Sequence, residues 1–241
     1  VGVGGNLGLP ALDLLAAERE LYVLELSSFQ LERAGSLGLA VATVLNVSAD
    51  HLDRHGSLQH YHQAKHRIFR GCAHAVVNRD DPLTLPLVGA ETAVSSWRMK
   101  EPELHGFGLR VMDGQEMLCL GFDALLAVNE LGMPGRHNVA NVLAALALGH
   151  AAGLPMPAML SAARSFGGLP HRCQLVAERA GVRFVNDSKG TNVGATAAAL
   201  RGFGEGAQVV LIAGGVGKGQ DFRPLRQALQ STAKALILIG E

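Results

Sequence analysis

The sequence has little cysteine, few aromatic residues, no net charge and no long apolar run. Of its 241 residues, three are cysteine and 5% are aromatic, and the formal net charge is zero. Three widely spaced cysteines form neither a disulfide framework nor a zinc-ligand spacing, which favours a reducing compartment. A chain without net positive charge is not typical of a general nucleic-acid binder. Its apolar runs are shorter than the roughly 20 residues that span a membrane, so we expect neither nucleic acid nor membrane as a partner.

What the sequence does have is an apolar content of 48% with mixed charges, which is typical of a folded protein of one large or two ordinary domains. Short apolar runs alternate with amphipathic stretches, the pattern of an α/β fold with a mostly parallel sheet. In the first part we predict strands at 21–26, 39–47 and 75–78 and helices at 10–18 and 58–70, the second with Ser57 as N-cap.

The pattern changes at residue 106, where two short apolar runs flank Asp113-Gly114, a strong hairpin signal. A long Ala- and Leu-rich helix follows, for which we predict Asn138 as N-cap and an end at Gly153. The Gly-Gly-Leu-Pro run at 167–170 predicts a boundary between domains 1–168 and 169–241. Beyond it we predict a hairpin at 174–186, a helix from Thr191 to 200 with Thr191 as N-cap, strands at 209–213 and 235–239, and a helix at 222–229.

Polar side chains follow two of the predicted strands. Glu25 ends the first and opens the run Glu-Leu-Ser-Ser-Phe-Gln-Leu-Glu, and Asn-Val-Ser-Ala-Asp-His-Leu-Asp follows the second at 46–53. A carboxylate at the carboxyl end of a parallel strand lies where such sheets bind ligands and suits magnesium. A helix-capping glutamate with a solvated pair of serines is the alternative for the first run. Zinc catalysis is one alternative for the second, since five of the ten histidines lie between residues 51 and 66, and a solvated helix face is the other.

The second half carries three further motifs. Asn138 and Asn141 are three residues apart at a helix start, so they share a face whose amides could bind an adenine edge. Arg172 suits a phosphate and Asp187 a ribose hydroxyl, with Thr191 at a helix start beyond it. The glycine-rich run around Lys218 lacks the Walker A spacing, so we interpret it as a turn that presents a lysine. Ordinary caps, turns and surface residues are the alternatives for all three.

In this order and spacing, the motifs resemble the Mur ligase family of ATP-dependent amide ligases of peptidoglycan precursor synthesis. The resemblance covers essentially the whole chain, and its most discriminating run is 25–32, which points to a member whose amino-acid substrate is D-glutamate. It implies an ATP-binding central domain with a mostly parallel sheet, followed by a Rossmann-like α/β C-terminal domain. Because the chain starts without Met and stops directly after an apolar run, we expect both domains to be incomplete, with an N-terminal domain and phosphate-binding loop before Val1 and more sequence after Glu241.

The resemblance also implies a reaction. ATP would phosphorylate the terminal carboxylate of UDP-N-acetylmuramoyl-L-alanine, and the amine of D-glutamate would attack the acyl phosphate. We expect a monomer in the bacterial cytoplasm. A sibling muramyl-peptide ligase or a folylpolyglutamate-type ligase is an alternative, and the isolated chain could be an inactive nucleotide-binding module.

Residue roles follow from the same resemblance. Magnesium would be held by Glu25, His51 and a carbamylated Lys65, and Lys65, His51 and Lys189 would be catalytic. Asn138 and Asn141 would bind adenine, Asp187 the ribose and Arg172 the phosphates of ATP. The sugar-peptide substrate would contact Asn6, Ser27 and Gln30, while Lys189, Thr191 and Lys218 would lie near the acyl phosphate and D-glutamate.

Overall fold

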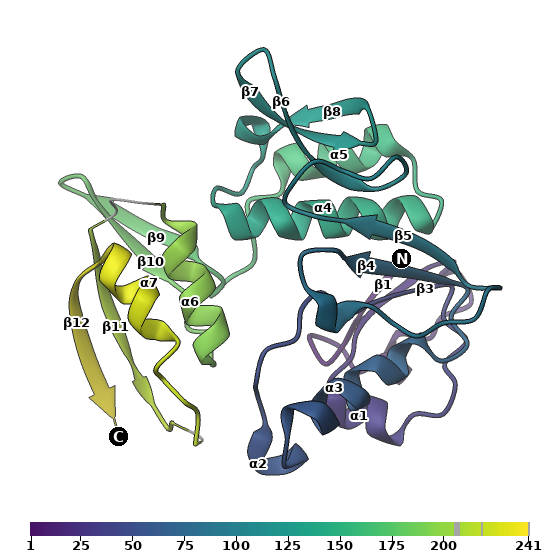
Figure 1. Cartoon of the computed structure of the whole chain (residues 1–241), viewed down its shortest axis with the longest axis horizontal. Helices are drawn as coiled ribbons and strands as arrows, with labels where there is room; N and C mark the ends of the chain where they lie inside the picture. Colours follow the sequence, from purple (N-terminus) through teal and green to yellow (C-terminus); the bar gives the residue numbers. More distant parts are fainter. Residues whose placement is uncertain (205–207, 218, 241) are drawn as a thin grey trace.

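The computed structural model describes residues 1–204, 208–217 and 219–240. These form two α/β units, the first coloured purple to teal and the second green to yellow in Figure 1. The first unit contains a sheet in the order β3-β4-β5-β6-β7-β8, in which β3 to β6 are parallel and β6 to β8 form an antiparallel meander. The strands are β3 Val41–Thr43, β4 His74–Asn78, β5 Ala93–Trp97, β6 Phe107–Met112, β7 Gln115–Leu120 and β8 Asp123–Ala127. The predicted α/β class and mostly parallel central sheet are confirmed.

A second, two-stranded parallel sheet lies at the start of the chain. It pairs β1 (Gly2–Gly5) with β2 (Tyr22–Glu25), and Gly5 is the register partner of Glu25. Both strands therefore end at the same edge, which brings the residues that follow them close together. The helix α1 (Ser28–Arg33) begins three residues after β2 ends.

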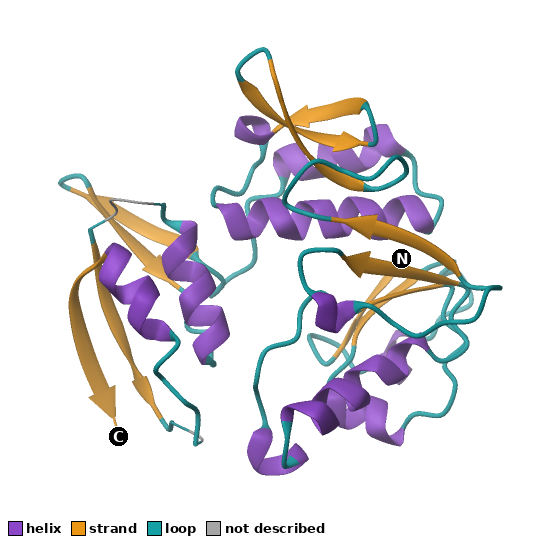
Figure 2. Cartoon of the chain, in the orientation of Figure 1, coloured by secondary structure: helices purple, strands orange, loops and turns teal. Residues whose placement is uncertain are grey.

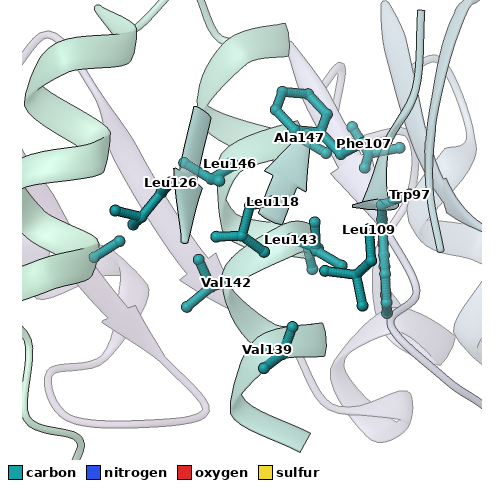
Figure 3. Close-up of a cluster of buried hydrophobic side chains, with 13 residues drawn as sticks. Trp97, Phe107, Leu109, Leu118, Leu126, Val139, Val142, Leu143, Leu146 and Ala147 are labelled. Atoms are coloured by element: carbon teal, nitrogen blue, oxygen red, sulfur yellow. The ribbon is translucent and has the colours of Figure 1, made fainter. Parts of the chain in front are cut away.

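Helices cover both faces of the six-stranded sheet, as Figures 1 and 2 show. On one face lie α4 (Arg136–Ala151) and, packed on it, α5 (Met156–Ser165). On the other face lies α3 (Leu58–His66), which follows α2 (Leu52–His55) and contacts α1. Figure 3 shows the first of these interfaces, where side chains of α4 interdigitate with those of β6, β7 and β8.

The core beneath α4 is the most completely buried part of the chain. Leu118 and Leu143 are both 0% exposed, and Leu126 is 1% exposed. Burying a leucine side chain contributes roughly 1.5–3 kcal/mol relative to leaving it in water. This packing fixes α4, and thereby the position of its first turn, against the sheet.

The second unit begins with the hairpin of β9 (Gln174–Arg179) and β10 (Val182–Asn186). It continues as α6 (Val193–Gly202), β11 (Val209–Gly215), α7 (Leu225–Thr232) and β12 (Ala233–Gly240), with β11 and β12 parallel. A small core of Ala197, Leu200 and Ala228 holds α6 against α7. The two units meet where α4 packs against α6.

Two of the predicted elements are shorter than expected. The predicted helix 10–18 is only a 3-10 turn at Ala11–Leu14, because the backbone N–H and C=O of Ala16 both bond to the Tyr22 hydroxyl. The predicted strand 39–47 is paired only over β3. Past it, the Asn78 amide donates to Leu45 O and the Asp81 carboxylate accepts from Val47 N, so side chains replace a sheet partner.

Two of the predicted helix caps are wrong and one is confirmed. Ser57 caps α3, because its Oγ accepts from His60 N at 3.2 Å. The N-cap of α4 is Gly135 rather than Asn138, whose side chain donates to Pro134 O instead. The N-cap of α6 is Asn192 rather than Thr191. Over the described residues, no helix is long and apolar enough to cross a membrane.

Candidate active site

Glu25 is the last residue of β2, and its carboxylate lies at the carboxyl edge of the small sheet. Asn6, which follows β1, donates from Nδ2 to Glu25 Oε1 at 3.0 Å, and its backbone N–H bonds to Glu25 O. On the other carboxylate oxygen, the Arg172 guanidinium approaches to 3.8 Å from the second unit. Glu25 is about half exposed, so the carboxylate is oriented by two partners and still open to a ligand.

The chain that follows β3 brings Asp50 and His51 to the same region. His51 has φ +51° at the N-cap position of α2, a left-handed conformation that costs a non-glycine residue energy and is found mainly where the surroundings enforce it. Asp50 Oδ1 accepts the His51 backbone N–H at 2.9 Å, and its Oδ2 lies 3.8 Å from His51 Nε2. The Phe29 ring holds the other side of the imidazole, edge-on at 5.0 Å.

Lys65 lies on α3 and completes this group. Its ammonium is placed over the Tyr61 ring at 5.0 Å from the centroid. Burial lowers the pKa of Lys65, while the nearby carboxylates of Asp50 and Glu25 act in the opposite direction. A partly desolvated lysine is a better nucleophile, because more of it is present as the neutral amine.

Burial and Asp50 together raise the pKa of Tyr61 to about 12. The phenol is therefore neutral at physiological pH. The structure thus places Lys65 near the carboxylates of Asp50 and Glu25 and over the Tyr61 ring, and Asp50 also lies against His51.

The predicted nucleotide residues lie at the junction of the two units. The amides of Asn138 and Asn141 lie side by side on α4, 3.4 Å apart, as their spacing predicts. Asp187, which follows β10, accepts from Cys173 N at 3.0 Å. His137, in the first turn of α4, lies near Asp187, which follows β10. Burial lowers the pKa of His137, and the Asp187 carboxylate opposes that shift.

Ser27 and Gln30 form a reciprocal capping box at the start of α1. Gln30 Oε1 accepts from Ser27 N at 2.8 Å, and Ser27 Oγ accepts from Gln30 N at 3.3 Å. Both are therefore held by the helix end. The cap is Ser27 rather than Glu25, and Ser28 is buried, so the alternative of a capping glutamate beside solvated serines is wrong. The Ser27 hydroxyl is also 3.0 Å from Gln30 Oε1, and the Gln30 side chain is exposed.

The remaining predicted residues precede and follow α6. Lys189 and Thr191 are exposed in the segment between β10 and α6, and Lys189 N donates to His171 O. Two N–H groups in the first turn of α6 are bonded by side chains, since Val193 N donates to Gln220 Oε1 and Ala195 N donates to Asn192 Oδ1. Lys218 lies outside the described residues.

Comparison with known proteins identifies the family. The profile of the Mur ligase middle domain matches residues 5–149, and that of the Mur ligase glutamate ligase domain matches residues 171–241. The chain is 55% identical over its whole length to a UDP-N-acetylmuramoylalanine–D-glutamate ligase of Pseudomonas syringae and to one of Pseudomonas aeruginosa. The chain belongs to the Mur ligase family. It spans about half of those relatives, 54% of each.

Solved structures agree on the fold of this Mur ligase chain. It superimposes on MurF from Acinetobacter baumannii with a TM-score of 0.72 and 19% identity, covering 95% of this chain and 53% of that one. Against MurF from Thermotoga maritima in complex with ADP, the TM-score is 0.69 with 20% identity, covering 98% and 64%. At these identities the likeness supports the Mur ligase fold alone.

The contacts of the α3 histidines bear on the zinc alternative. Within the described ranges, no three His, Cys, Asp or Glu side chains are grouped as a metal site. His62 and His66, one turn apart on α3, both donate from Nε2 to Leu83 O, at 2.9 and 2.7 Å. Both imidazoles are thus held by one backbone carbonyl, so the described residues offer no support for the zinc alternative.

Glu25 supplies the hard oxygen that magnesium prefers. A Lys65 ammonium would repel the ion, whereas a carbamate on the same nitrogen would supply a second oxygen donor.

Sequence reasoning named no role for Asp50, His55 or Asn192. Asp50 directly precedes His51, so its place in the motif was the available signal. His55 is buried between α1 and α3, and Asn192 meets Asp50 across the junction of the units. Neither contact has a local sequence signature, because each joins segments that are distant in the chain.

Proposed function

We propose that this chain forms the central and C-terminal parts of an ATP-dependent ligase that joins D-glutamate to UDP-N-acetylmuramoyl-L-alanine in peptidoglycan precursor synthesis. The observation that carries the proposal is 55% identity over the whole chain to ligases of that name. The carboxylates of Glu25 and Asp50 near Lys65, and the contact of Asp50 with His51, support it. The enzyme acts as a monomer in the bacterial cytoplasm.

In this proposal, the boundary between the two domains lies between residues 168 and 169. The glycine-rich segment there falls between the two family matches, which end at 149 and begin at 171. Nucleotide residues are divided across the boundary: Asn138 and Asn141 precede it, and Arg172 and Asp187 follow it. Binding of ATP therefore depends on how the domains are arranged.

Glu25, His51 and Lys65 would hold magnesium, which would offset the charge on the phosphates and the acyl oxygen. Lys65 would act as a carbamate: its neutral amine nitrogen bonds to the carbon of CO₂, and the displaced proton leaves to solvent. The lowered pKa of Lys65 favours the reactive neutral amine. The exposed half of the Glu25 side chain leaves it accessible to the ion.

Asn138 and Asn141 would read the adenine edge, because paired amides offer both a donor and an acceptor. The Asp187 carboxylate would accept a hydrogen bond from the ribose, and Arg172 would bind the phosphates with its guanidinium. Arg172 contacts Glu25 at 3.8 Å in the structure. Nucleotide and metal would therefore replace that ion pair with two stronger contacts.

At the opposite end, Asn6, Ser27 and Gln30 would contact the sugar-peptide. Lys189, Thr191 and Lys218 would lie near the acyl phosphate and D-glutamate, with Lys189 stabilising the charge that develops on the acyl oxygen. The substrate carboxylate oxygen first bonds to the γ-phosphorus of ATP, and ADP leaves with the electrons of the broken P–O bond. The D-glutamate amine then bonds to the acyl carbon, loses a proton, and phosphate departs with the C–O bond pair. These residues contribute mainly by positioning and charge.

A chimeric ligase tests the proposal: this chain replaces the corresponding region of the Pseudomonas aeruginosa relative. We expect ATP-dependent phosphate release and a D-glutamylated product, with D-glutamate preferred over other amino acids in a panel. A folded chimera that prefers another amino acid would favour a sibling ligase, and one that forms no amide would overturn the proposal. Titration calorimetry of residues 1–241 with ATP and magnesium measures how much nucleotide binding these residues supply alone.

The role of Lys65 has its own test. We expect Lys65→Ala in the chimeric ligase to lose most of its turnover and to regain part of it with added short carboxylates, which can replace the carbamate oxygens. Turnover equal to that of the unmodified chimera would show that the metal role of Lys65 is wrong.

A further inference from the structure

Among the described residues, Asp50 forms a short, largely buried hydrogen bond between the two domains. Its Oδ2 accepts from Asn192 Nδ2 at 3.0 Å, across 142 residues of sequence. Its Oδ1 accepts the His51 backbone N–H at 2.9 Å. The side chain is only 16% exposed, so each carboxylate oxygen has a defined partner in a partly dehydrated position.

Both polar atoms of the Asn192 side chain also have hydrogen-bond partners. As the N-cap of α6, it accepts the Ala195 N–H on Oδ1 at 2.8 Å, while its Nδ2 faces Asp50. The oxygen is therefore held by the helix, which leaves the nitrogen directed at the other domain. Serine, threonine and aspartate cap helices as well as asparagine does, but none of them offers an N–H donor for this second contact.

One further contact places the start of α6 close to the proposed site, and another joins it to a loop of its own unit. Gly194 approaches Ser48 so closely that an added Cβ would lie 2.9 Å from the serine Oγ. Within the second unit, Val193 N donates to Gln220 Oε1 in the loop before α7 at 3.0 Å. The first turn of α6 thus meets the loop that follows β3 and also holds the loop that follows β11.

We propose that Asp50 and Asn192 form an interdomain latch, the Asp50–Asn192 latch, that positions the α6 end of the C-terminal domain over the Glu25–His51–Lys65 group. The residues that it positions, Lys189 and Thr191, lie directly before α6. The link to catalysis rests on the proposed function, whereas the latch itself rests on the hydrogen bonds alone. Asp50 and Asn192 are positioning residues in this proposal.

The latch differs from the other polar contact across the boundary. Arg172 and Glu25 are 3.8 Å apart, each about half exposed, and both are needed by ligands in the proposed function. A contact of that kind is weak and is given up when ligands bind. The Asp50–Asn192 latch uses neither residue, so it can persist while nucleotide and metal are bound.

An exchange of the two side chains tests the latch. Asn192→Asp keeps the helix cap but places two carboxylates face to face, and Asp50→Asn keeps the His51 contact but places two amide nitrogens face to face. With both substitutions together, the new amide at position 50 donates to the new carboxylate at position 192. Each cap is retained throughout, so all variants are expected to fold.

Small-angle X-ray scattering of residues 1–241 measures the arrangement of the two domains. We expect a larger radius of gyration for each single variant and a return to the wild-type value for the double variant. Loss of a charge-assisted hydrogen bond shifts such an equilibrium by about tenfold or more. Asn129→Asp, an exposed position in the turn after β8, is the matched control for added charge.

In the chimeric ligase, we expect kcat/KM for D-glutamate to fall about tenfold or more in each single variant and to recover in the double variant. Recovery distinguishes positioning from a purely local effect of Asp50 on Lys65, because the negative charge has moved to the other domain. Single variants with unchanged scattering, or a double variant no closer to wild type than the singles, would overturn the latch. An inactive chimera with the scattering pattern intact would instead count against the proposed function.

Discussion

The His55 side chain is fully buried near the candidate site, and its truncation allows a quantitative prediction. The side chain is 0% exposed. Its Nε2 shares a hydrogen bond of 3.0 Å with the Ser28 hydroxyl, and its Nδ1 lies 3.4 Å from Glu32 Oε1. The ring is parallel to Phe29 at a centroid distance of 5.5 Å and tilted against Tyr61 at 5.2 Å. His55 therefore fixes α2 to α1 and α3 at once.

His55→Ala removes this ring and leaves two defects. Truncating a buried aromatic ring to alanine costs roughly 3–5 kcal/mol, and an unpaired buried hydroxyl costs about 1–3 kcal/mol. The two costs overlap, because the cavity admits water that can bond to Ser28. We expect the free energy of unfolding to fall by about 4 kcal/mol, a large part of the roughly 5–15 kcal/mol typical of a domain.

Urea denaturation followed by tryptophan fluorescence measures this loss. The chain has one tryptophan, Trp97, which is 4% exposed in β5 and so reports on the first domain. His105→Ala is the control, since His105 is exposed in the loop before β6 and its replacement should change stability by less than about 0.5 kcal/mol. A loss below about 1 kcal/mol for His55→Ala would show that the ring is not packed as described.

Three further predictions concern stability. Tyr61 has a pKa raised to about 12, so the unfolded chain loses its phenol proton first, and stability should decline as pH rises from about 10 towards 12; Tyr61→Phe should remove that part of the decline in alkaline urea titrations. Leu143→Ala should cost about 2–5 kcal/mol in the same assay at neutral pH, because a side chain that is 0% exposed leaves a cavity. Ser57→Ala should cost about 1 kcal/mol, since it removes the cap of α3, and Ser57→Asp should restore most of it.

Much of the fold was predictable because its signals are local. The hairpin at Asp113-Gly114, the α/β alternation and the end of β2 at Glu25 each depend on residues next to one another in the chain. The shared face of Asn138 and Asn141 follows from helix periodicity in the same way. Within the small sheet, parallel strands that end at one edge account for the contact between Asn6 and Glu25.

The helix starts show where local reasoning failed. Asn138 and Thr191 have side chains that favour caps, but α4 begins after Gly135 and α6 after Asn192. Several residues near a helix start can serve as the cap, and the differences among them are about 1 kcal/mol or less. Packing of α4 on the sheet and of α6 on α7 therefore decides which residue is used.

The sequence by itself determined the family, the order of the elements and the residue types at the ends of the strands. The tertiary structure decided which distant residues meet: Asp50 with Asn192, His55 with Ser28, and Arg172 with Glu25. Periodicity and turn chemistry act over a few residues, so they fix elements but not their partners. Those pairings depend on strand register and on the packing of α4 against α6, which arise only when the whole chain has folded.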